Sequence, residues 1–327
     1  MAGLRARDFP QGGAFSPAFF LRYPFVVASA QLIRTFTHAA LGPDPDIAVA
    51  ALMIARLEYP ELDASRYLAQ LDLIGEEAGR RLSIAVPPAD TPHDVDADRY
   101  AKVVALNAYL FDELHFVGNE TDYGDPRNSF LNEVIDRRTG IPITLSLVYM
   151  EVARRAGLAI EGINFPGHFL LRCPASRGAT YTRDLIIDPF HGGALVSRDL
   201  LAQQAGGRDE DEDPARFESR LLPRANTLQI LSRMLANLKR IYVNMQSLPQ
   251  ARDVADMLIA LDPSAIGELR DRGLLAYNLK DFPGALRDLQ AYLKLIPSGE
   301  QDDEERRDRE RIWEHVKTLR KRVASLN

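Results

Sequence analysis

GIPITLSLVYMEVARRAGLAIEGINFPGHFLLRC (residues 140–173), followed after a short loop by LIIDPFHGG (185–193), decides the fold of this 327-residue chain. No charged residue occurs from Pro142 to Met150, and the apolar side chains there cover nearly every side of a helix. A helix that is apolar all round is a buried helix. Pro142 suits its first turn, because the amide that proline lacks would have no partner there. Glycines bracket this helix on both sides, as helix breakers do.

After the buried helix the periodicity changes to that of short strands. Residues 159–165, 168–173 and 183–188 are expected to form an antiparallel hairpin or meander. His168 then starts one strand and Asp188 ends another. If the strands pair, the imidazole and the carboxylate come within hydrogen-bonding reach. A carboxylate fixes the tautomer of a histidine and stabilises its charged form, which supplies half of a nucleophilic triad.

This arrangement resembles the papain-like transglutaminase core, in which a helix ending in glycine precedes a strand with histidine and a strand ending in Asp-Pro. That family uses a Cys-His-Asp triad, with the cysteine at the start of the buried helix. The resemblance places His168 and Asp188 at the histidine and aspartate positions. It places Pro142 at the cysteine position, so the nucleophilic thiol is missing.

A closer resemblance is to the SirB-type bacterial proteins, which join a transglutaminase-like domain to tetratricopeptide repeats. The matching segments are ALMIARLEYPELDASRYLAQLD, SFLNEVIDRRTGIPITLSLVYMEVARRAGL, PGHFLLR and IDPFHGG. They cover roughly residues 45–205. Because that branch itself lacks the cysteine, the resemblance implies little about activity.

The sequence before the buried helix predicts a mostly helical region. Helices are expected over 26–39, 46–59 and 100–114, and Asp63 is expected to cap a further helix. A short helix then follows the polar turn around Asp125. The predicted stop of that short helix is Gly140.

The last third of the chain repeats itself. SLPQARD (247–253) and DFPGALRD (281–288) superimpose Pro249 on Pro283 at an offset of 34 residues. This period is typical of helix-turn-helix repeats of the tetratricopeptide type. The final helix, about 303–324, is expected to cap the stack by covering the apolar face of its neighbour.

These patterns predict an α+β protein with a mostly helical N-terminal part, a papain/transglutaminase-like core with a small antiparallel sheet, and C-terminal tetratricopeptide-type repeats. The expected domains are an N-terminal arm with helices packing on the core (1–92), the core (93–205), an acidic linker or loop (206–222) and the repeats with their capping helix (223–327). Five consecutive acidic residues, 209–213, mark the linker, because such a run resists packing.

The candidate catalytic residues are His168 and Asp188, with Thr144 or Ser146 as a replacement nucleophile. A buried hydroxyl more often bonds the carbonyl four residues earlier, and the His–Asp pair alternatively serves as a structural hydrogen bond. Cys173 lies five positions after His168, which places it on the opposite face of a straight strand. It therefore reads as a packing residue. The candidate groove-lining residues are Pro142, Asn128, Tyr123 and His191.

Composition limits the classes of partner. The chain has 46% apolar residues, 26% charged residues and a net charge of −6. This balance is that of an ordinary globular protein and argues against nucleic-acid binding. A single cysteine excludes an internal disulfide, and six scattered histidines make a metal site a weak prediction. Neither a cofactor nor a metal is expected.

No apolar run is long enough to span a bilayer, so a cytoplasmic location is expected and membrane partners are not.

Three functions remain open. The first is a non-catalytic regulatory or scaffold protein that binds a protein or peptide, favoured by the missing thiol and by the repeats. The second is an acyl-transfer enzyme, a hydrolase or transglutaminase. It would use His168 as base, Asp188 to orient it, and a hydroxyl or water as nucleophile. The third is a regulator of gene expression that acts through proteins rather than through DNA. The oligomeric state stays open.

Overall fold

The computed structural model describes residues 30–175, 183–197, 200, 201, 203, 222–296 and 303–324. The chain divides into two compact units. The core unit comprises the described parts of 45–55 and 61–234, and the repeat unit comprises those of 1–44, 56–60 and 235–327. The predicted N-terminal arm and the acidic run at 209–213 lie outside the described residues.

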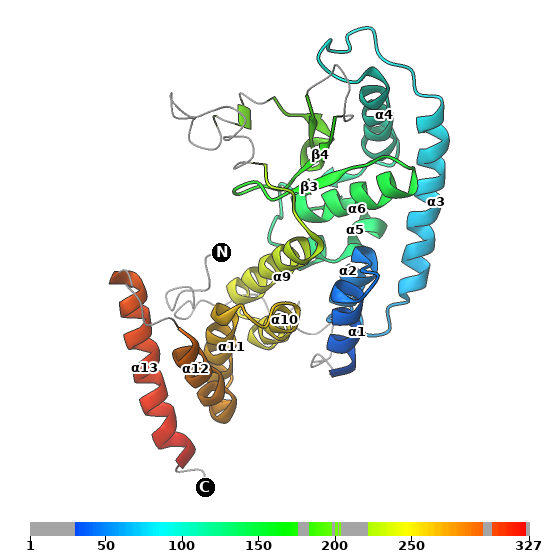
Figure 1. Ribbon diagram of the computed structural model, residues 1–327. Coiled ribbons are helices and arrows are strands. Elements are labelled where there is room, and N and C mark those ends of the chain that lie inside the picture. Colours follow the sequence, from blue (N-terminus) through cyan, green and yellow to red (C-terminus); the bar gives the residue numbers. More distant parts are fainter. Residues whose placement is uncertain are drawn as a thin grey trace. The chain divides into compact units, whose positions relative to one another are not determined.

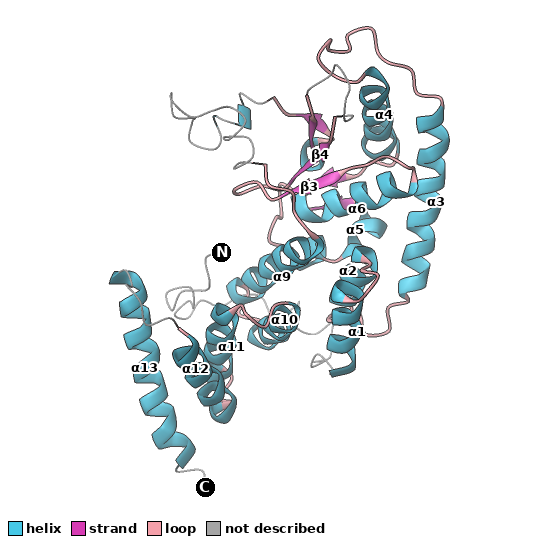
Figure 2. Cartoon of the chain, viewed as in Figure 1, coloured by secondary structure: helices cyan, strands magenta, loops and turns pink. Residues whose placement is uncertain are grey.

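In the core unit several helices pack around one central helix, α6 (Figures 1 and 2). Its helices are α2 (Ile47–Ala55), α3 (Ala64–Ser83), α4 (Ala97–Asn107), α5 (Leu131–Arg137) and α6 (Pro142–Arg155). A π-helical turn, Ala108–Glu113, extends α4, and a 3-10 turn, Pro126–Ser129, precedes α5. The Asp63 carboxylate accepts a hydrogen bond from the Ser65 amide at the start of α3, which confirms the predicted cap.

Helix α6 is the buried helix that its sequence predicts. Pro142 occupies its first turn, and the side chains from there to Tyr149 are buried. Its close packing against α3 depends on Gly75, because a Cβ at that position would lie 2.3 Å from the Cβ of Arg155. Arg155 also pairs with Asp72 of α3, with Nε and Oδ1 2.7 Å apart. The helix is therefore held by apolar burial, and the ion pair between Arg155 and Asp72 ties its end to α3.

A four-stranded antiparallel meander lies against α6 (Figure 1). Its strands are β3 (Glu161–Ile163), β4 (Leu170–Cys173), β5 (Leu185–Asp188) and β6 (Ala194–Leu195), in that spatial order. The first three confirm the predicted strands with shorter bounds. The prediction that His168 starts a strand is wrong: it lies in a turn two residues before β4. Gly167 has a φ of +72° in this turn, and the His168 amide bonds the carbonyl of Phe165.

A second, two-stranded parallel sheet corrects the predicted helix stop. Helix α5 ends at Arg137, and Arg138 takes the left-handed conformation with a φ of 57°. Gly140 instead belongs to β2 (Thr139–Gly140), which pairs with β1 (Val117–Gly118). A Cβ on Gly140 would lie 2.9 Å from Oγ1 of Thr144. Close packing at the start of α6, rather than helix termination, therefore explains this glycine.

The repeat unit is built from helical hairpins. Its helices are α1 (Ala30–Leu41), α10 (Leu248–Leu261), α11 (Ile266–Asn278), α12 (Phe282–Leu295) and α13 (Asp303–Ala324), while α9 (Thr227–Asn244) begins in the core unit. Helices α10 and α12 have the same length and the predicted offset of 34 residues. Helices α11 and α12 approach closely at Gly273, where a Cβ would lie 2.7 Å from Leu289.

Helix α13 packs on α12 as expected of a capping helix. Its buried residues are Ile312, Val316 and Leu319. Trp313 of the same helix is 44% exposed and lies beside the Arg320 guanidinium. None of the described helices combines the length and apolarity that a membrane-spanning segment requires.

Candidate functional site

Asp188 is the centre of the candidate site because it ends β5 and begins a 3-10 turn at the same time. Its Oδ1 accepts a hydrogen bond from the Phe190 amide at 3.0 Å, as a helix N-cap does. Its own carbonyl accepts a bond from the Gly193 amide at 2.9 Å. These two bonds fix the carboxylate and direct Oδ2 toward its side-chain partners.

His168 lies beside this carboxylate. Its Nε2 is 2.8 Å from Oδ2 of Asp188, which is the separation expected of the predicted pair. An ionised carboxylate only accepts hydrogen bonds, so Nε2 carries the proton. In the neutral ring Nδ1 is then the basic nitrogen. The His168 side chain is 21% exposed, so the ring is partly accessible to solvent.

His191 binds the same oxygen atom. Its Nδ1 also lies 2.8 Å from Oδ2 of Asp188, and the centroids of the two imidazole rings are 5.9 Å apart. Burial by itself would raise the pKa of Asp188, but the hydrogen bonds from His168 and His191 outweigh burial and lower the pKa. Asp188 therefore stays ionised at neutral pH while it holds two imidazoles.

Phe190 organises both rings. Its edge-to-face contacts place its centroid 6.2 Å from that of His168 and 5.2 Å from that of His191. Tyr123, which is 39% exposed, also makes an edge-to-face contact with Phe190, with the ring centroids 6.2 Å apart. A Cβ on Gly118 would lie 2.7 Å from the Phe190 ring, so β1 presses closely on this side chain. The two histidines thus sit on a packed aromatic support.

The proposed replacement nucleophiles occupy buried positions. Thr144 Oγ1 donates to the carbonyl of Asn128 at 2.7 Å and accepts from the Ile141 amide at 3.1 Å. Its hydroxyl therefore closes the first turn of α6. Ser146 Oγ is buried and has no hydrogen-bond partner among the described residues. Neither hydroxyl is hydrogen-bonded to His168 in the described part of the chain.

Two of the four predicted groove residues contribute little surface. Pro142 and Asn128 are both buried. The Asn128 amide donates to the carbonyl of Asp122 at 2.8 Å and accepts from Asn119 at 3.1 Å. This residue therefore ties down the loop that carries Tyr123. Tyr123 and His191 are the two members of the set that are exposed.

Cys173 is a packing residue, as its position in β4 indicates. The side chain is almost completely buried, and burial raises the pKa of its thiol to about 11. A buried neutral thiol is a poor nucleophile, because the thiolate is the reactive form.

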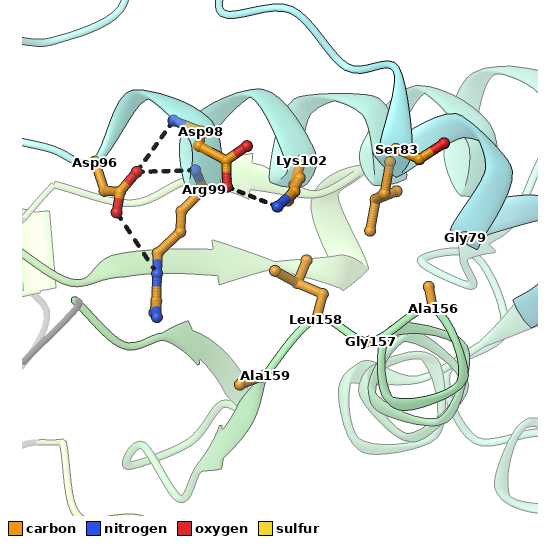
Figure 3. Close-up of a pocket in the computed structure, with 11 residues that line it drawn as sticks. Gly79, Ser83, Asp96, Asp98, Arg99, Lys102, Ala156, Gly157, Leu158 and Ala159 are labelled. Atoms are coloured by element: carbon orange, nitrogen blue, oxygen red, sulfur yellow. Dashed lines mark hydrogen bonds and ion pairs between the residues drawn. The ribbon is translucent and has the colours of Figure 1, made fainter.

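A separate pocket lies in the core unit between the end of α3, the start of α4 and the turn after α6. Figure 3 shows the side chains that line its volume of about 450 Å³. Lys102 pairs with Asp98 at 2.6 Å, and Arg99 Nε lies 3.8 Å from Asp96. Its cationic side chains therefore already have acidic partners, and the described residues that line the pocket include no nucleophile–base pair.

The sequence placed His191 among the groove-lining residues and did not predict its hydrogen bond to Asp188. The available signal was the spacing in Asp188-Pro-Phe-His191: in a 3-10 turn, residues three apart lie on one side. A proline after the aspartate favours such a turn, since it suits the first helical position.

Comparison with known families supports the two-part organisation. A family model described as the transglutaminase-like superfamily matches residues 65–236, and a tetratricopeptide-repeat model matches residues 238–317. The first match contains His168, Asp188 and His191. The second contains α10, α11 and α12.

Curated relatives extend along most of the chain. A UPF0162 protein of Xylella fastidiosa is 39% identical over 253 residues, which are 76% of this chain and 83% of that protein. A UPF0162 protein of Pseudomonas aeruginosa is 30% identical over 257 residues, covering 77% and 85% of the two chains. The human F-box only protein 21 is 32% identical over 212 residues, or 62% of this chain and 32% of that protein.

Proposed function

This chain belongs to the transglutaminase-like superfamily, and we propose that it is a non-catalytic member that binds a protein or peptide partner. In this proposal it is a regulatory or scaffold protein of the SirB-type branch. The tetratricopeptide repeats supply the interaction element, and the transglutaminase-like core retains a triad remnant without a nucleophile. The proposed location is the cytoplasm.

The single observation that carries the proposal is the residue at the start of α6. A cysteine nucleophile in this family stands at the beginning of the buried helix, where the helix dipole lowers the pKa of its thiol. Here Pro142 occupies that first turn. Its ring offers neither a thiol nor a hydroxyl for His168 to activate.

The neighbouring hydroxyls support the same conclusion. A serine or threonine nucleophile needs a hydrogen bond to its general base. The Thr144 hydroxyl donates its proton to the backbone carbonyl of Asn128 and accepts a hydrogen bond from the Ile141 amide. If this hydroxyl bonded His168 instead, those buried backbone groups would be left unpaired. Thr144 is therefore better explained as a structural cap.

Reintroducing the thiol tests the position of the missing nucleophile. We expect the wild-type chain to remain unmodified by an activated acyl ester, whereas Pro142→Cys becomes acylated at residue 142. The double variant Pro142→Cys/His168→Ala should react at least about tenfold more slowly, since general-base help typically contributes more than that. The native thiol, Cys173, serves as the internal control, because it lies in β4 rather than at a helix start and burial raises its pKa to about 11.

Two outcomes would count against the proposal. Acyl transfer or peptide hydrolysis by the wild-type chain, lost in a folded His168→Ala variant, would establish an enzyme. Failure of Pro142→Cys to react, with folding intact, would remove the argument that Pro142 stands at the nucleophile's position.

Partner binding is tested through the repeats. Repeats of this type bind extended segments on the surface formed by their stacked helices. A photoreactive residue at Asn278, exposed near the end of α11, should give discrete cross-linked adducts in cells. The matched control position is His93, which is exposed in the core unit. Equal and diffuse labelling from both positions would contradict a repeat-mediated interaction.

A second candidate function is an acyl-transfer enzyme with an unusual nucleophile. The observation in its favour is that Nε2 of His168 lies 2.8 Å from Asp188, which leaves Nδ1 available as a base. Two assays, amine incorporation and peptide hydrolysis, decide between an enzyme and a binding protein. They are applied to wild type, His168→Ala and Ser146→Ala. An enzyme loses turnover in both folded variants, while a binding protein shows no turnover in any of the three.

A further inference from the structure

Three potential metal ligands converge at the candidate site. They are His168 Nε2, His191 Nδ1 and Asp188 Oδ2, and all three atoms lie within 4.8 Å of one another. We propose that His168, Asp188 and His191 bind one divalent transition-metal ion, with zinc as the best fit. This inference goes beyond the proposed partner binding and does not depend on it.

The donor set matches the chemistry of zinc. Two imidazole nitrogens and one carboxylate oxygen are borderline ligands that suit zinc better than magnesium or calcium, which prefer oxygen ligands. Zinc binds nitrogen and oxygen at about 2.0 to 2.2 Å, so its tetrahedral ligands lie about 3.4 Å apart. The two imidazoles stand 2.8 Å from Asp188 Oδ2. A small outward movement of each ring therefore admits an ion.

The ligands are held before any ion arrives. Asp188 is fixed through its other carboxylate oxygen by the Phe190 amide at 3.0 Å. Both imidazole rings pack against the Phe190 side chain, which Gly118 and Tyr123 hold in turn. Such supporting contacts orient metal ligands and strengthen binding. An isolated hydrogen-bonded His–Asp pair does not require a second histidine on the same oxygen.

The site is open enough for an ion to enter. The Asp188 side chain is 10% exposed, that of His168 21% and that of His191 55%. Three protein ligands leave one position of a tetrahedral ion for water or for another ligand. On binding the ion, each imidazole changes tautomer: the ligating nitrogen loses its proton and the other nitrogen of the same ring carries one. The ring therefore stays neutral, as a metal-bound imidazole is.

Zinc binding to the full chain tests this site. The metal-stripped protein is titrated with zinc chloride against a chromophoric chelator, and we expect one ion per chain with a dissociation constant at or below micromolar. His191→Ala, His168→Ala and Asp188→Asn should each weaken binding by about tenfold or more, as loss of a ligand or its support does. His93→Ala, at an exposed histidine outside the cluster, should bind as wild type does.

Two further measurements separate a defined site from nonspecific binding and from unfolding. Cobalt(II) should give the visible absorption bands of a four-coordinate ion with wild type but not with His191→Ala. Zinc should raise the melting temperature of wild type and leave that of His191→Ala unchanged, while circular dichroism confirms that both are folded. The proposal is overturned if zinc shows no saturable binding at micromolar concentrations, or if His191→Ala binds zinc as wild type does.

Discussion

Lys239 and Asp271 form a buried ion pair in the repeat unit, with Nζ and Oδ2 2.7 Å apart. Both side chains are almost fully enclosed. The same ammonium lies 2.5 Å from Glu268, and the Arg270 guanidinium contacts the other oxygen of Asp271. Burial raises the pKa of Glu268, and the charge of Lys239 partly opposes that rise. The network joins α9 to α11 inside the repeats.

Removal of the buried cation should destabilise the repeat unit strongly. Lys239→Met leaves two carboxylates with one cationic neighbour fewer, at an expected cost of about 3 kcal/mol in the free energy of unfolding. Urea unfolding followed by tryptophan fluorescence measures this cost, because Trp313 of α13 is the chain's only tryptophan. Lys317→Met, at an exposed pair with Glu314, should cost under about 0.5 kcal/mol. Equal effects of the two variants would contradict the buried network.

Two glycines of one helix should respond in opposite ways to the same substitution. Gly273→Ala introduces a Cβ at 2.7 Å from the buried Leu289, so we expect a loss of about 1 to 3 kcal/mol. Gly267→Ala meets no atom within 4 Å, so it should be neutral or stabilising by up to about 1 kcal/mol. The measurement is again urea unfolding followed by Trp313 fluorescence. A stabilising Gly273→Ala would show that α11 and α12 are not packed as described.

The Asp188 carboxylate at the candidate site should stabilise the folded protein whether or not a metal ion is bound. Asp188→Ala leaves two imidazoles and the Phe190 amide without their acceptor, which should cost about 2 to 3 kcal/mol. Asp188→Asn keeps one carbonyl acceptor and should cost less. Thermal unfolding by circular dichroism, in the presence of a chelator, measures both. Asp94→Ala, at an exposed pair with Arg183, is the matched surface control and should change stability little.

Alkaline pH should destabilise the core unit through Cys173. Burial raises the pKa of this thiol from 9.0 to about 11, so the folded state holds its proton more tightly than the unfolded state does. The resulting stability is fully present below pH 9 and is lost as the pH rises toward 11. Its full size is about 2 to 3 kcal/mol, since each pKa unit corresponds to about 1.4 kcal/mol.

The measurement for Cys173 compares unfolding free energies at pH 8 and pH 10.5. Wild type should lose more stability across this interval than Cys173→Ala does, because alanine does not titrate. Groups that do not interact with Cys173 cancel in the comparison, whereas Tyr149, whose pKa is raised by burial and also by the charge of Cys173, does not. Rapid alkylation of Cys173 in the native protein at pH 8 would contradict its burial.

Much of the fold follows from local sequence patterns. The uncharged run after Gly140 predicts α6, because an apolar surface on every side has to be buried. Asp63 predicts the start of α3, because its carboxylate satisfies amides that the helix leaves unpaired. The offset of 34 residues between Pro249 and Pro283 predicts the helical hairpins, since each repeat buries its apolar face on the next.

Part of the candidate site also follows from the sequence. The sequence placed His168 at the start of one strand and Asp188 at the end of another, and from this it predicted a pair. His168 lies instead in the turn before β4, and the pair forms with Nε2 and Oδ2 2.8 Å apart. The family resemblance adds that Pro142 stands where a thiol is expected. Neither argument predicts a second imidazole on Asp188, because its position depends on the 3-10 turn and on the packing of Phe190.

The sequence by itself determined the buried helix, the meander and the repeats, because burial and chain geometry act on neighbouring residues. Tertiary structure alone decided the rest. Gly140 serves a close approach between strand and helix rather than a helix stop, and Arg138 takes the left-handed conformation in its place. Trp313 is exposed although its neighbours in α13 are buried. His191 joins His168 on one carboxylate oxygen, because contacts between distant segments set which side chains meet.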